Sequence, residues 1–126
     1  MTNETQLQNS WLWQFHRNSP TWKKVRLGRV SNQGDAKFEK VLLRFADAIF
    51  IEQDTVHIVE TKIAPKADAI GQLLLYEGLF RETPEFVQYK DFPIRKIMLT
   101  TREDPAITKL AAEHDVQVVV YNILNT

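Results

Sequence analysis

The fold is decided by residues 46–81, which read ADAIFIEQDTVHIVETKIAPKADAIGQLLLYEGLFR. Residues 46–51 and 56–63 are rich in β-branched and aromatic side chains, and the polar connector 52–55 has the length of a hairpin turn. Apolar side chains then recur at helical spacing over residues 65–81, and the proline that opens this segment suits a first helical turn. This stretch predicts two antiparallel strands followed by a helix.

The chain after this helix predicts a strand–helix–strand unit. Residues 85–93 are expected to form a loop with aromatic anchors, followed by a strand over 94–100. A helix is predicted over 105–114 and a strand of nearly continuous valine over 117–121. Such a crossover joins parallel strands with a right-handed connection. Strand 56–63 is apolar on both faces, which is typical of a strand inside a sheet that is covered on both sides.

The region before residue 46 is less regular. Residues 6–17 have the apolar spacing of a short amphipathic helix, and residues 22–30 are predicted as a strand. Residues 31–35 form a cluster of turn-favouring side chains. Residues 38–45 fit either a strand or a short helix, and we favour a strand.

Composition limits the possible classes of protein. The chain has 126 residues, of which 44% are hydrophobic and 25% charged, as in a single globular domain. Sixteen basic side chains balance sixteen acidic ones, which excludes a generic nucleic-acid-coating polycation. The absence of cysteine excludes disulfide scaffolds, cysteine-ligated zinc and thiol nucleophiles. No apolar run approaches the ~20 residues of a membrane span, so we expect no membrane partner and a cytoplasmic location.

Charge is concentrated at the N-terminus. Residues 1–30 carry five basic side chains and a single acidic one, together with four aromatic residues: Trp11, Trp13, Phe15 and Trp22. Basic side chains between aromatic ones are typical of surfaces that follow a phosphate backbone and stack on bases. The candidate nucleic-acid-binding residues are therefore Lys23, Lys24, Arg26 and Arg29. The alternative, that the aromatic residues are core and the lysines are merely solvated, stays open.

Five side chains suggest a common site. Asp47 lies near the start of the first predicted strand, and Glu60 and Lys62 share one face of the second. Because two neighbouring carboxylates need a compensating charge, an adjacent Asp47 and Glu60 favour a hard divalent cation such as Mg²⁺. Lys62 would then stabilise an attacking hydroxide. Gln72 and Tyr76, four residues apart on the helix, would close over the site.

These residues resemble the PD-(D/E)xK nuclease superfamily, in the branch with a trailing QxxxY motif that contains RecB-like and Holliday-junction-resolvase-like nucleases. The resemblance covers about residues 36–121 and rests on Asp47, on Glu60-Thr61-Lys62, and on the helical glutamine and tyrosine. It implies an α/β, restriction-endonuclease-like core, in which a mixed β-sheet (a β-meander followed by α-β-α-β) is flanked by helices. The chain would be a single nuclease-like domain over residues 1–126, with residues 1–30 as a basic and aromatic extension.

The resemblance also implies a set of metal ligands: Asp47, Glu60, Thr61 and Glu39. The family usually has an acidic residue on an early helix. Glu39 is the best candidate for it, with Asp35 behind it and Glu4 as a remote third option. Ala46 stands where the family's name has proline, a proline that is often absent in the family.

The reaction implied is Mg²⁺- or Mn²⁺-dependent hydrolysis of DNA phosphodiester bonds, in DNA repair, recombination or phage DNA processing. The catalytic residues would be Asp47, Glu60, Lys62, Gln72 and Tyr76. A chain of this size would act as a homodimer or as a subunit of a larger complex, in the cytoplasm or, if virus-encoded, in the host cytoplasm. The alternative is an inactive nuclease fold that serves as a structural, assembly or DNA-binding module. His16, His57 and His114 have no partners at ligand spacing and are expected to be structural or surface residues.

Overall fold

The computed structural model describes residues 2–29 and 44–123. Its five strands form one sheet in the order β1-β2-β3-β4-β5. The strands are β1 (Thr21–Leu27), β2 (Arg44–Glu52), β3 (Thr55–Thr61), β4 (Ile94–Thr100) and β5 (Val116–Val120). The other elements are α1 (Glu4–His16), α3 (Ala67–Arg81), the 3₁₀ segment η1 (Pro84–Tyr89) and α4 (Pro105–Glu113). The predicted turn at 31–35 and residues 38–43 of the predicted strand lie outside the described residues.

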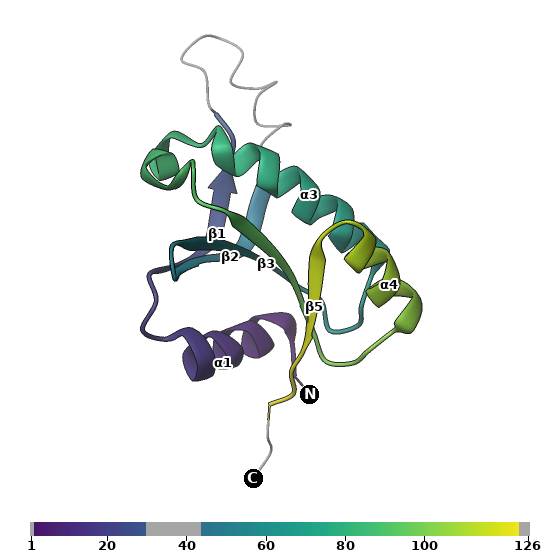
Figure 1. The fold of residues 1–126 in the computed structure, drawn as a ribbon. Helices are drawn as coiled ribbons and strands as arrows, with labels where there is room; N and C mark the ends of the chain where they lie inside the picture. Colours follow the sequence, from purple (N-terminus) through teal and green to yellow (C-terminus); the bar gives the residue numbers. More distant parts are fainter. Residues whose placement is uncertain (1, 30–43, 124–126) are drawn as a thin grey trace.

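The sheet is mixed. Strand β2 is antiparallel to both β1 and β3, whereas β3, β4 and β5 are parallel to one another. Helix α3 connects β3 to β4, and α4 connects β4 to β5. Figure 1 shows α1 on one face of the sheet and α3 and α4 on the other. The predicted β-meander followed by α-β-α-β is therefore confirmed.

The turn between β2 and β3 explains why these strands pair in this register. Gln53 and Asp54 have φ angles of 54° and 55°, and the flanking Glu52 and Thr55 pair directly across the hairpin. Two consecutive residues with positive φ are characteristic of a type I′ turn, whose twist matches that of the strands. The predicted connector at 52–55 is confirmed.

Each face of the sheet has its own apolar core. On the α3 side, Leu73 and Phe80 pack with Ile58 of β3 and Met98 of β4. On the other side, α1 covers the sheet with three buried apolar side chains. These are Leu7, Trp11 and Leu12, which pack against Phe50, Val59 and Leu99. The burial of α1 fixes its N-terminal half over the open end of the β2–β3 hairpin.

Several element boundaries differ by a few residues from the sequence prediction. Strand β3 ends at Thr61 rather than at residue 63, so Lys62 follows the strand instead of lying within it. Helix α3 begins at Ala67 rather than at Pro65, because Lys66 has extended backbone angles and occupies the N-cap position. The predicted loop at 85–93 begins with η1, which buries Phe86. The start of α4 is as predicted, with Pro105 in its first turn and the Asp104 carboxylate accepting hydrogen bonds from two main-chain N–H groups. No helix in residues 2–29 or 44–123 is long and apolar enough to cross a membrane.

Candidate functional site

Asp47 lies where β2 and β3 separate. The last main-chain pair of this ladder joins Ala48 to Val59. Beyond it, the Thr61 N–H donates a hydrogen bond of 2.8 Å to Oδ2 of Asp47. The carboxylate thus takes the place of a main-chain acceptor and is held at the end of β3, where Glu60 and Thr61 pair with β4 on the other side.

Glu60 and Lys62 meet Asp47 at this point. The Glu60 side chain is only 6% exposed, and its Oε2 lies 3.6 Å from the Lys62 ammonium nitrogen. The pKa of Glu60 is raised to about 7, first by burial and then by the Asp47 carboxylate, which acts as a charge and as a hydrogen-bond partner, while the Lys62 cation offsets part of the rise. The structure therefore brings together the three side chains at the centre of the predicted site.

One oxygen of this cluster has no partner. Oε1 of Glu60 is buried and accepts no hydrogen bond from any residue in the described part of the chain. A buried carboxylate oxygen without a donor is costly, because it has lost the water that solvated it. The site thus holds an acceptor that a proton or a cation would stabilise.

Gln8 of α1 holds the site from the opposite side. Its side-chain nitrogen donates to the Asp47 main-chain oxygen at 3.2 Å, and its side-chain oxygen accepts from the Thr61 hydroxyl at 2.8 Å. Gln8 is buried, so both bonds are shielded from water. The helix is therefore linked to β2 and β3 at the two positions that flank the carboxyl cluster.

A pocket of about 210 Å³ opens beside Asp47. Its lining residues come from α1, β1, β2 and the end of β3: Glu4, Thr5, Gln8, Asn9, Lys23, Lys24, Asp47 and Thr61. Glu4, the remote third option for the upstream acidic residue, thus lies at the same pocket as Asp47. Glu39 and Asp35 lie outside the described residues. Within the described ranges, no three His, Cys, Asp or Glu side chains gather closely enough to hold a metal ion together.

The other predicted site residues, Gln72, Tyr76 and Arg29, do not line the Asp47 pocket. Tyr76 is buried in the core between α3 and the sheet, and Gln72 is partly buried on the same helix, with its Oε1 unpaired among the residues described. Arg29 is exposed after the end of β1.

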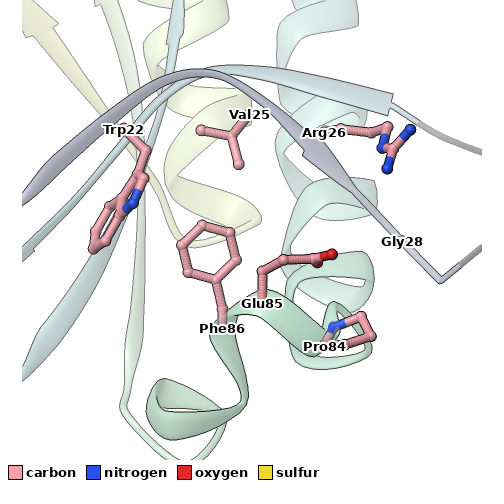
Figure 2. A pocket seen from close by; sticks show the side chains of 7 residues that line it. All are labelled: Trp22, Val25, Arg26, Gly28, Pro84, Glu85 and Phe86. Carbon is pink, nitrogen blue, oxygen red and sulfur yellow. The ribbon is translucent and has the colours of Figure 1, made fainter.

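The predicted basic segment is divided between two surfaces. Lys23 and Lys24 line the Asp47 pocket, whereas Arg26 lines a separate pocket of about 480 Å³ between β1 and η1. Figure 2 shows Trp22, Val25 and Phe86 turned toward one another in that second pocket. Trp22 also packs edge-on against the Phe86 ring, so it belongs to the core face of β1.

The histidines have structural surroundings. His16 and His57 both stack on the Phe50 ring, with ring centroids 4.2 and 4.4 Å from that of Phe50. His16 also bonds the Glu52 carboxylate through Nδ1 at 2.9 Å. His114 is exposed at the end of α4.

Sequence reasoning missed Gln8 and placed Glu4 last. A usable signal was present for Gln8, because it stands three and four residues before Trp11 and Leu12 and so lies on the apolar face of the predicted helix. A polar side chain at such a position needs a buried partner. Glu4, one turn earlier, follows onto the same pocket once Gln8 is placed.

Solved structures with this fold include two endonuclease structures. The crystal structure of a repair endonuclease from Pyrococcus abyssi matches 96% of this chain with a TM-score of 0.61 and 11% sequence identity. The structure of an EndoMS–dsDNA2 complex matches 100% of it with a TM-score of 0.60 and 16% identity. This chain spans about half the length of both, 48% and 47%. No protein-family model and no curated protein matches it.

These similarities establish the fold as the α/β, restriction-endonuclease-like architecture that the motif implied. They match nearly the whole chain, α1 and β1 included. The assignment to the QxxxY branch stays a prediction.

Proposed function

We propose that this protein is a metal-dependent nuclease that hydrolyses DNA phosphodiester bonds. The observation that carries the proposal is the convergence of Asp47, Glu60 and Lys62 at the open end of the β2–β3 hairpin. Two carboxyl groups beside a lysine form the minimal apparatus for hydrolysing a phosphodiester with a divalent cation. Of the three, Asp47 lines the pocket, whereas Glu60 and Lys62 do not.

The residues fit Mg²⁺ or Mn²⁺. Hard cations bind carboxylate and main-chain oxygens, and Oε1 of Glu60 is a buried oxygen with no donor in the described residues. Asp47, Glu60 and Thr61 would hold the ion, with Glu4 at the pocket or Glu39 as the further acidic residue. A bound cation would polarise the phosphate and lower the pKa of a coordinated water.

The protein's own side chains complete the chemistry. Lys62 stabilises the negative charge of the attacking water as it loses its proton, because its ammonium group already lies against Glu60. Gln72 is proposed to orient that water through its free side-chain oxygen, and Tyr76 to fix the helix that carries Gln72. Lys23 and Lys24 hold the phosphate backbone at the pocket.

The structural neighbours support DNA as substrate and repair as setting. One neighbour is described as a repair endonuclease and the other was solved with double-stranded DNA. Recombination and phage DNA processing stay predictions, as does action as a homodimer or as a subunit.

The test is cleavage of duplex, single-stranded and branched DNA with Mn²⁺, compared between the natural protein and Lys62→Ala. We expect the variant to lose cleavage by roughly 100-fold or more, since the group that stabilises the nucleophile is gone. Lys66→Ala is the matched control, because Lys66 is an exposed lysine just before α3 and has no place in the site. Equal cleavage by Lys62→Ala and the natural protein would overturn the proposal.

A second candidate function is an inactive nuclease fold used as an assembly or DNA-binding module. It is favoured by one observation: the described residues gather only two carboxylates, and Lys62 already neutralises one of them. This candidate predicts DNA or protein binding with no cleavage by the natural protein under any divalent cation. The same assay therefore separates the two functions.

A further inference from the structure

A wide groove lies between the outer face of α1 and the start of β1. Its volume is about 820 Å³. The residues that line it are Asn9, Ser10, Leu12, Trp13, Gln14, His16, Arg17, Ser19, Thr21 and Lys23. No acidic side chain is among these described lining residues, whereas Arg17 and Lys23 bring positive charge. The Glu52 carboxylate bonds the lining residues His16 and Ser19 at one end of the groove, away from Lys23. The lining side chains themselves carry a net positive charge, although the chain as a whole is neutral.

The groove is continuous with the candidate site. Asn9 and Lys23 line both the groove and the pocket that contains Asp47. The Lys23 ammonium donates a 2.7 Å hydrogen bond to the Asn9 side-chain oxygen, which places the cation at the junction. A linear ligand seated beside Asp47 can therefore continue into the groove and meet Lys23 on its way.

Helical periodicity aligns the wall of the groove. Asn9, Trp13 and Arg17 are spaced four residues apart, so they follow one face of α1 with a rise of about 6 Å per step. The Trp13 side chain is 68% exposed, which is exceptional for tryptophan. The Arg17 guanidinium lies over its ring, 4.6 Å from the centroid, and bonds the Trp13 main-chain oxygen.

An exposed tryptophan next to basic side chains is suited to binding a nucleic-acid strand. Flat aromatic rings bind unpaired bases by stacking, and neighbouring basic side chains contact the phosphates. Paired bases in a duplex are already stacked within the helix and offer no free face to such a ring. A tryptophan ring exposed in this way therefore favours a single strand over a duplex as its ligand.

We propose that the α1–β1 groove binds a single-stranded stretch of DNA that continues from the Asp47 pocket, with a base stacked on Trp13 and phosphates against Lys23 and Arg17. The inference rests on the proposed function for the identity of the ligand and adds the substrate class: DNA with an unpaired segment next to the scissile bond. It also assigns a role to Trp13 and Arg17.

The test measures binding without cleavage. A fluorescently labelled single-stranded oligonucleotide and its duplex form are titrated with the full chain in EDTA, and affinity is read from fluorescence anisotropy. We expect the single strand to bind more tightly than the duplex. Trp13→Ala weakens single-strand binding roughly tenfold, and Trp13→Phe retains most of it because the ring is kept.

Phe15→Ala is the matched control. Phe15 is another exposed aromatic residue of α1, but it contacts the Tyr121 ring and does not line the groove. Its removal leaves the affinity unchanged. Circular dichroism verifies that each variant is folded, as expected for exposed side chains.

The inference is overturned if Trp13→Ala binds the single strand as tightly as the natural protein, if Phe15→Ala loses as much affinity, or if the duplex binds equally well. Cleavage by the natural protein in Mn²⁺, measured beside its binding in EDTA, distinguishes this result from the fate of the nuclease proposal. Binding through the groove and cleavage at Asp47 are read in separate assays, so they can fail separately.

Discussion

At the scale of single residues, the candidate site contains a buried carboxyl group that lowers the stability of the fold. Glu60 is buried beside another carboxyl group, and one of its oxygens has no donor in the described residues. A buried leucine or methionine at this position would avoid the cost of a buried carboxylate. The Glu60 carboxyl is therefore more easily explained by function than by stability.

The raised pKa of Glu60 has a measurable consequence for stability. Because its pKa is about 7 in the folded state and near 4.5 in the unfolded chain, the folded state binds the proton more tightly. Stability in EDTA is therefore greatest below pH 4.5 with respect to this group and falls as the pH rises through 7. The loss amounts to about 3 kcal/mol in the free energy of unfolding.

Glu60→Gln should remove this pH dependence. We expect the variant to unfold at higher urea concentration than the natural protein at pH 8, and at a similar concentration near pH 4.5. Urea denaturation at both pH values is the measurement. Parallel stability profiles for the two proteins would show that Glu60 titrates normally and is not held against Asp47 in a buried cluster.

At the scale of elements, β1 departs from a regular strand at one residue. Lys24 has a φ of 51°, between Lys23, which pairs with Ala48, and Val25, which pairs with Ala46. In a regular strand neighbouring side chains point to opposite faces, yet Lys23 and Lys24 both line the Asp47 pocket. The left-handed residue thus turns two consecutive cations toward the same site.

Lys24→Gly should raise the stability of the protein while lowering its affinity for DNA. Glycine adopts positive φ without strain, so we expect the free energy of unfolding to rise by up to about 1 kcal/mol. Lys23→Gly is the control, since glycine in a regularly paired strand position should lower stability by roughly 0.5–1 kcal/mol. Both variants lose DNA affinity. Chemical denaturation with anisotropy on the same samples gives the comparison, and a destabilised Lys24→Gly would argue against strain at this residue.

At the scale of the whole molecule, local sequence patterns predicted the β2–β3 hairpin and its carboxyl cluster. The docking of α1 on the sheet depends on long-range packing and was not predictable in this way. The alternation around Glu60 and Lys62 and the short connector at 52–55 are local signals, so the hairpin and the convergence with Asp47 were predictable. The docking of α1 depends on contacts between residues about forty positions apart, such as Gln8 with Asp47. Spacing along the chain contains no information about that contact.

The same limit explains the basic segment. Composition grouped Lys23, Lys24 and Arg26 as one binding surface, because they are neighbours in sequence. The irregular backbone at Lys24 and the packing of η1 against β1 place Arg26 in another pocket. The side-chain direction of each cation depends on tertiary structure, which a count of charges does not contain.

Salt dependence tests this division of charge. The chain is neutral overall, so attraction of DNA depends on local groups of cations such as those at the site and the groove. With Arg17, Lys23 and Lys24 each neutralising a phosphate, log K for a single strand should fall against log salt with a slope of about −2. Replacing Lys23 and Lys24 by alanine should reduce the slope to about −0.7. Adding Arg26→Ala should change it no further, because Arg26 lines the pocket between β1 and η1. A triple variant with a clearly flatter slope than the double would place Arg26 on the DNA path after all.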